Sequence, residues 1–303
     1  MGCPDFSAPS LSALASDKSF EVAVVYSMPD RPKGRGHQRS VTPVKSLAIK
    51  LGLPVKTVTS FSKSPEECEE LKAFSPDFLI VIAYGLILPQ VVLDIPKIAA
   101  VNIHASLLPR YRGPSPIHFS ILNGDSVSGL TAIKMNSRMD EGDILAQKTV
   151  TIGPNDTFVS LHDRLSNEAP QFLIQTVRAF FQGSIIPKPQ IHSDATYTSK
   201  ITPSMGQINW ENPASTLSKL VRALASSPGA WFEAKGERIK IGAAEEGSPT
   251  DSSPGTLLSR DPKSGIQIAC GNRTSLVLRS LQRPGKGMMS SDDFLRGFPK
   301  FSL

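Results

Sequence analysis

Apolar residues gather in short runs along the first 182 positions of the chain, and helical patterns separate these runs. The apolar runs predict strands, at residues 21–26, 55–58, 78–83 and 98–103. The segments between them predict helices, at residues 7–16, 43–51 and 65–74, the first with Ser7 as a candidate cap. Residues 78–83 include no polar position, which is typical of a strand covered on both faces in a parallel sheet. This alternation predicts an α/β fold.

The second part of the chain has a different pattern. Residues 116–122 and 157–181 predict helices, and residues 129–135 and 143–151 predict strands. Residues 183–204 contain Pro187 and Pro189 and are typical of a linker. After a helix at 213–225 come five short β-rich runs, at residues 230–234, 238–243, 255–258, 266–270 and 275–281. These runs predict a small barrel, so we expect one domain at residues 1–182 and another at residues 205–303.

Two polar residues stand at the end of the fourth apolar run. Asn102 and His104 are two positions apart, so a strand would direct both side chains to the same face. The loop after them, residues 107–113, would leave the carboxyl edge of the sheet, where open α/β sheets bind ligands. An isolated Asn and His at a strand end are more often structural, so this pattern alone leaves catalysis and structure both open.

A second stretch, residues 139–145, adds an Asp-x-Gly-Asp sequence in which Asp140 and Asp143 compete for one role. Asn-x-His, Ser-Leu-Leu-Pro and Asp-x-Gly-Asp in this order resemble the folate-dependent formyltransferases, most closely those that act on methionyl-tRNA. The resemblance covers nearly the whole chain. Its other matching pieces are residues 2–6, 29–32, 34–36, 83–89 and 281–286.

The resemblance implies a Rossmann-like, mostly parallel sheet in the formyltransferase domain, followed by an OB-like β-barrel domain. It implies a catalytic trio of Asn102, His104 and Asp140, with Asp143 as a turn or capping residue. The formyl donor would be 10-formyltetrahydrofolate, used without a metal. Its binding residues would be Ala83, Tyr84, Gly85, Leu86, Ile87, Ser106, Leu107, Leu108 and Pro109.

The acceptor implied by the resemblance is methionyl-initiator tRNA. The net charge of +6 favours an anionic partner without identifying it. In isolation, the basic segment at residues 31–39 is consistent with a solvated loop, but the resemblance implies that it grips tRNA phosphates. The tRNA-binding residues would be Arg31, Lys33, Arg35, Arg39, Lys200 and Lys286.

Formyl transfer requires attack on the formyl carbon, stabilisation of an oxyanion and movement of a proton from the incoming to the leaving nitrogen. Asn102 and His104 suit the oxyanion, and Asp140 would orient His104 and favour its cationic form. No nucleophilic Ser or Cys has a paired base, which favours direct transfer. Two other classes stay open: another formyltransferase-family enzyme, such as a formyltetrahydrofolate hydrolase or small-amine formyltransferase, and a non-catalytic RNA-binding protein.

The first residues of the chain and its cysteines give information about the cellular compartment of the protein. Residues 2–6 resemble the turn after the first strand of the family, so we expect a strand before Gly2. Three widely spaced cysteines favour a reducing compartment, and no apolar run approaches the roughly 20 residues that span a bilayer. We therefore expect a monomer in a bacterial cytoplasm, without a membrane partner. A mitochondrial or plastid location is the alternative if a targeting segment precedes this sequence.

Overall fold

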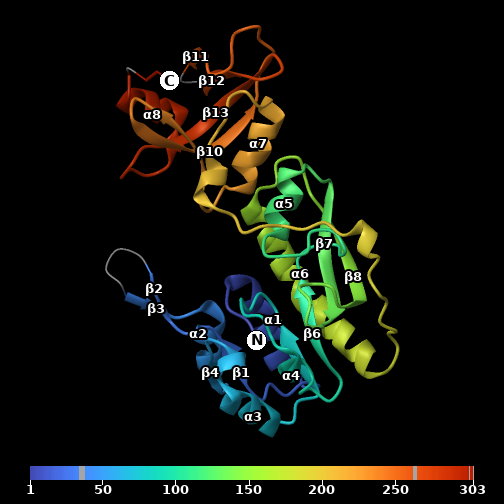
Figure 1. The fold of residues 1–303 in the computed structure, drawn as a ribbon. Coiled ribbons are helices and arrows are strands. Elements are labelled where there is room, and N and C mark those ends of the chain that lie inside the picture. The colour runs from blue at the N-terminus through green and yellow to red at the C-terminus, as the bar shows by residue number, and fades with distance from the viewer. Residues whose placement is uncertain (34–37, 262–264, 300, 303) are drawn as a thin grey trace. The chain divides into compact units, whose positions relative to one another are not determined.

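The computed structural model describes residues 1–33, 38–261, 265–299 and 301–302. The chain divides into two compact units, each built from three segments (Figure 1). The first unit consists of Met1–Pro116, Val127–Thr151 and His162–Thr198. The second consists of Ile117–Ser126, Ile152–Leu161 and Ser199–Leu303. Residues 183–198, inside the predicted linker, group with the first unit.

The strands of the first unit confirm the predicted α/β fold with a Rossmann-like, mostly parallel sheet, to which antiparallel strands are added. Strand β1 (Val25–Ser27) runs parallel to β4 (Val55–Thr57), and β5 (Phe78–Val81) runs parallel to β6 (Ala99–His104). Two further strands, β7 (Val127–Lys134) and β8 (Asp143–Thr151), extend the sheet from β6 by antiparallel pairing. A separate antiparallel hairpin joins β2 (Arg31–Lys33) to β3 (Gln38–Ser40).

The helices of the first unit follow the predicted segments closely. They are α1 (Ala8–Ser16), α2 (Pro43–Lys50), α3 (Pro65–Ala73) and most of α6 (Phe158–Phe181), together with the short α4 (Gln90–Leu93), which was not predicted. Thr42 caps α2 by accepting a hydrogen bond from the Lys45 N–H. Ser7 occupies the N-cap position of α1, but the predicted cap bond is wrong, because its hydroxyl donates to the Ile82 carbonyl at 2.7 Å. No described helix combines the length and apolar character needed to cross a membrane.

Met1 and Gly2 lie between β1 and β5, where the predicted first strand would run. The Gly2 N–H donates to the Tyr26 carbonyl at 3.1 Å, and the Ile82 N–H donates to the Met1 carbonyl at 3.0 Å. The Met1 ammonium donates to the Ile80 carbonyl at 2.6 Å. These bonds join β1 to the β5 edge.

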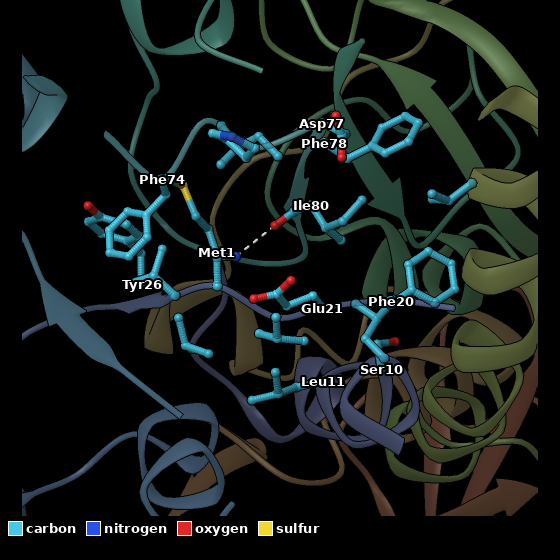
Figure 2. Close-up of a pocket in the computed structure, with 18 of the residues that line it drawn as sticks. Met1, Ser10, Leu11, Phe20, Glu21, Tyr26, Phe74, Asp77, Phe78 and Ile80 are labelled. Carbon is cyan, nitrogen blue, oxygen red and sulfur yellow. Dashed lines mark hydrogen bonds between the residues drawn. The ribbon is translucent and has the colours of Figure 1, made fainter. Parts of the chain in front are cut away.

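A cavity of about 670 Å³ adjoins Met1 (Figure 2). It lies between the residues that precede β1, including Phe20 and Glu21, and those at the start of β5, including Asp77 and Phe78. Figure 2 shows the hydrogen bond from Met1 to Ile80 at this cavity. The residues that line it do not include the predicted catalytic trio.

In protein prepared to begin at Met1, the buried amine of Met1 is expected to make folding stability depend on pH. Burial lowers the pKa of this amine from 8.0 to about 5. Between these values the unfolded chain carries the extra proton, so the free energy of unfolding should rise from pH 5 to pH 8, by up to about 4 kcal/mol. Urea unfolding across this range would measure the rise, using protein whose intact Met1 is verified by mass spectrometry.

Acetylation of Met1 gives the control for this measurement because it removes the titrating amine. The difference in slope between free and acetylated protein isolates Met1 from the other titrating groups. Equal slopes would contradict a lowered pKa of the Met1 amine.

The second unit contains the predicted antiparallel strands. The strand order is β11 (Leu257–Asp261), β12 (Gly265–Cys270), β13 (Thr274–Gln282), β10 (Glu237–Glu246) and β9 (Ala230–Ala234), with β14 (Met289–Ser290) also on β13. Its helices are α5 (Pro116–Leu122), α7 (Ala214–Ala223) and α8 (Ser291–Gly297). Leu217 and Val221 of α7 pack with Phe232, Ile268 and Leu278 in one core. Strand β11 begins later than predicted, α8 and β14 were not predicted, and closure into a barrel stays a prediction.

Candidate active site

The predicted site lies at the edge of the sheet where β5 and β6 end. Because these strands are parallel and Val81 pairs with Asn102, their carboxyl ends meet at this edge. Asn102 and His104 alternate with Val101 and Ile103, whose side chains are buried in the sheet. The alternation places both polar side chains on one face of β6, as predicted.

His104 is held by a contact that the sequence did not predict. Its Nε2 lies 2.9 Å from the Tyr111 carbonyl oxygen, and a carbonyl can only accept, so Nε2 carries a proton. The other ring nitrogen, Nδ1, faces Asp140 Oδ1 at 3.7 Å. The main chain thus fixes the imidazole and directs Nδ1 toward the carboxylate.

Asp140, rather than Asp143, is the acid that the structure brings beside His104. Its main chain is left-handed, with φ of 55°, and its Oδ2 accepts a hydrogen bond from the Gly113 N–H at 2.7 Å. Asp143 instead begins β8, where it pairs with Lys134. The left-handed turn at Asp140 directs its carboxylate toward β6.

Asn102 has an unsatisfied polar atom. Its Oδ1 is buried, and no hydrogen-bond partner is found for it in the described part of the chain. Leaving such an atom unpaired costs about 1–3 kcal/mol, so a polar ligand would recover stability there. Rotation of the amide can present either its oxygen or its NH₂ group to that ligand.

The predicted folate loop follows β5 at the same edge. Ala83 and Gly85 both have positive φ, of 45° and 87°, which turns the main chain sharply after the strand. Tyr84 and Leu88 are buried, and burial raises the pKa of the Tyr84 hydroxyl. Ile87 is 78% exposed. Among the apolar side chains of this loop, Ile87 is therefore available to contact a ligand, while Leu88 is buried in the core and Leu86 is partly buried against it.

The predicted folate residues 106–109 form a tightly bonded loop. The Ser106 hydroxyl donates to the Arg110 carbonyl at 2.7 Å. Thr131 donates to the Ser106 carbonyl and accepts from the Leu108 N–H. Leu108 is buried, while Leu107 and Pro109 are partly exposed. The Ser106 side chain therefore stabilises the loop, and a folate contact from it stays a prediction.

Comparison with known proteins identifies the family of this chain. Residues 2–177 match the formyl transferase family, and residues 200–299 match the C-terminal domain of formyl transferases. This chain belongs to the formyl transferase family. A relative from Trichlorobacter lovleyi named methionyl-tRNA formyltransferase is 38% identical over 99% of the chain and 93% of its own length. One of the same name from Aromatoleum aromaticum is 41% identical over 98% and 93%.

A solved formyltransferase structure shares the fold. It is the N-formyltransferase from Helicobacter canadensis in complex with folinic acid and dTDP-3-aminofucose. The TM-score is 0.68 at 18% identity, over 93% of this chain and 97% of that one. At this identity the likeness concerns the fold alone.

The predicted tRNA-binding residues of this formyl transferase lie in separate parts of the chain. Arg31 and Lys33 belong to β2 and Arg39 to β3, so they share one hairpin, whereas Arg35 lies outside the described residues. Lys200 and Lys286 belong to the second unit and are exposed. Strands β2 and β3 thus define the main chain at both ends of the basic segment. Binding of tRNA by this segment stays a prediction.

Sequence reasoning missed several residues that hold the Asp140 turn. Arg112 is only 1% exposed and pairs with Glu141, at 3.3 Å between Nη1 and Oε1. Gln190 is also buried and donates to the carbonyls of Asp140 and Gly142. Arg112 looked like one more charge in a surface loop, and Gln190 fell in the predicted linker, so neither had a local signal.

Gly142 is required by a close main-chain approach in this turn. A Cβ at Gly142 would lie 2.0 Å from the Lys134 carbonyl oxygen. Gly142→Ala should therefore separate the two strands of the β7–β8 hairpin locally, costing roughly 2–4 kcal/mol of stability and displacing Asp140. Thermal unfolding and kcat would measure both effects. Gly297→Ala, where a Cβ meets open space, is the control; equal behaviour of the two variants would refute the close approach.

Proposed function

We propose that this chain transfers the formyl group of 10-formyltetrahydrofolate to the α-amino group of methionyl-initiator tRNA. The observation that carries the proposal is the similarity of both units, along nearly their full length, to relatives named methionyl-tRNA formyltransferase. The site agrees with it, because a conformationally fixed imidazole, a carboxylate and an unsatisfied amide meet at one sheet edge. The reaction would take place where initiator tRNA is charged, in a bacterial cytoplasm or in an organelle.

The proposed step is a direct transfer. The amine nitrogen attacks the formyl carbon, the carbonyl bond becomes an oxyanion, and the bond from the carbon to N10 of the folate then breaks. One proton leaves the incoming nitrogen and one reaches N10, so atoms and charges balance. No covalent enzyme intermediate is needed, in agreement with the Ser106 hydroxyl being bonded within its loop.

We propose a distinct part in this step for each residue of the trio. The Asn102 side chain would donate to the oxyanion through its NH₂ group. His104 keeps Nε2 bonded to Tyr111, so Nδ1 is the ring nitrogen available to accept the amine proton and pass it to N10. Asp140, 3.7 Å from Nδ1, would stabilise the imidazolium while it exists. This role differs from the expectation from sequence, in which a cationic His104 served the oxyanion.

The folate donor is proposed on two grounds. The Helicobacter canadensis N-formyltransferase, which shares the fold, is described in complex with folinic acid. In the present chain, the exposed positive-φ residues Ala83 and Gly85 follow Val81, which pairs with Asn102, and their main-chain atoms could bind the polar edge of a pterin.

An assay with purified protein and 10-formyltetrahydrofolate, with and without methionyl-tRNA, tests the function. We expect formylmethionyl-tRNA to form only when the charged tRNA is present. Release of formate without tRNA would support a hydrolase, and formylation of small amines would support a different transferase. Binding of tRNA without turnover would support a non-catalytic RNA-binding protein.

A further inference from the structure

The turn that carries Asp140 is held from outside its own hairpin. Asp140 has a left-handed main chain, which for a residue other than glycine costs energy unless neighbours fix it. The Gln190 Nε2 atom donates to the carbonyl of Asp140 and to that of Gly142, each at 2.8 Å. One amide group therefore forms hydrogen bonds to the main chain on both sides of Glu141.

The orientation of the Gln190 amide is set by Arg112. The Gln190 Oε1 atom accepts from Arg112 Nη2 at 2.8 Å and from Nε at 3.1 Å. A guanidinium has donors only, so it must face the amide oxygen, and the amide NH₂ group is left for the turn. Glu141 offsets the charge of the buried guanidinium, and the Tyr197 hydroxyl accepts from Nη1 at 3.1 Å.

Main-chain bonds fix the position of Arg112 itself. The Arg112 N–H donates to the Thr196 carbonyl, and the Thr198 N–H donates to the Arg112 carbonyl, both at 2.8 Å. The next residue, Gly113, donates its N–H to Asp140 Oδ2. The same short segment therefore fixes Asp140 twice, through its carboxylate and, by way of Gln190, through its main chain.

We propose that Gln190 and Arg112 are positioning residues, which hold the Asp140 carboxylate beside His104. The inference rests on the proposed function, since it concerns the same trio. Asp140 has only a 3.7 Å contact with the imidazole, so the imidazole itself does little to fix the carboxylate. A displacement of about 1 Å at a reacting group can cost up to roughly 100-fold in rate.

Gln190→Glu tests this directly, because glutamate keeps an oxygen for Arg112 but loses the NH₂ group that binds the two carbonyls. We expect kcat to fall roughly 10-fold, with KM for both substrates within about twofold of wild type. In an Asp140→Asn background, Gln190→Glu should change kcat by less than about twofold. Gln267→Glu is the matched control, since Gln267 Nε2 donates to Ser275 Oγ in the second unit.

The outcomes separate the inference from the proposed function. If wild-type protein formylates methionyl-tRNA and Gln190→Glu leaves kcat unchanged, the positioning role is overturned and the function stands. The same holds if the Gln190 effect is undiminished without Asp140. If wild-type protein is inactive, hydrogen exchange at the Gly113 amide tests the positioning role of Gln190 instead. Faster exchange in Gln190→Glu than in Gln267→Glu supports that role, and equal exchange overturns it.

Discussion

Replacing His104 with alanine is expected to lower kcat for formyl transfer roughly 100-fold or more. The variant loses the ring nitrogen that faces Asp140, and with it the group proposed to accept the amine proton. KM for both substrates and the melting temperature should change little, because among the described residues the imidazole makes a single close hydrogen bond, to Tyr111. Steady-state kinetics with saturating folate and methionyl-tRNA would measure the effect.

The other two members of the trio extend this test. Asn102→Ala and Asp140→Ala should each lower kcat on a similar scale. Because Asp140 is proposed to act through His104, the double variant of these two residues should be scarcely slower than His104→Ala alone. Residues with a purely structural role would instead lower the melting temperature together with activity.

His162→Ala is the matched control for His104→Ala. His162 packs against Phe6 with ring centroids 5.4 Å apart, and its Nδ1 faces the neighbouring Asp163. Its replacement should lower stability slightly and leave kcat unchanged. Near-wild-type turnover by a well-folded His104→Ala protein would end the proposed mechanism.

Much of the first unit could be predicted because its signals are local. The apolar run at Phe78–Val81 identified β5, and the two-residue spacing placed Asn102 and His104 on one face of β6. Strand β1 is shorter than its apolar run, since only Val25–Ser27 pairs with a neighbour. The pattern of apolar and polar positions thus predicted where strands occur more accurately than where they begin and end.

The finer structure of the site depends on contacts between distant residues. Spacing alone left Asp140 and Asp143 equivalent, and the choice is made by a left-handed turn that no apolar pattern encodes. The bond between Arg112 and Gln190 spans 78 positions. Such contacts follow from the folded main chain, so neither residue could be assigned from its neighbours in sequence.

Positive φ recurs among the residues of the site, although it also occurs at turns elsewhere in the described chain. Ala83, Tyr111 and Asp140 all have left-handed main chains and are neither glycine nor asparagine. One follows β5, one supplies the carbonyl for His104, and one carries the carboxylate. Strain of this kind persists where surrounding contacts fix it, which is common in functional sites.

Neutralising Arg35 and Arg39 together is expected to weaken the use of tRNA while sparing folate. The two arginines belong to the basic segment 31–39, which β2 and β3 frame as a hairpin, with Arg39 opposite Pro32. Contacts to phosphate need only reach and charge, so the loss should be electrostatic. KM for methionyl-tRNA should rise roughly 10-fold to 100-fold at low salt, with KM for the folate within about twofold.

The dependence on salt distinguishes this role from a general loss of structure. Each phosphate contact that is lost should reduce the slope of log affinity against log salt by roughly 0.7 to 0.9, so the double variant should lose about 1.5 units of slope. The control neutralises Lys97 and Arg178, which pair with Asp77 and Asp17 on the first unit and carry the same total charge. If the Arg35 and Arg39 variant keeps the wild-type slope, the hairpin does not bind tRNA phosphates. A slope that falls equally in the control would mean that net charge, rather than the hairpin, attracts the tRNA.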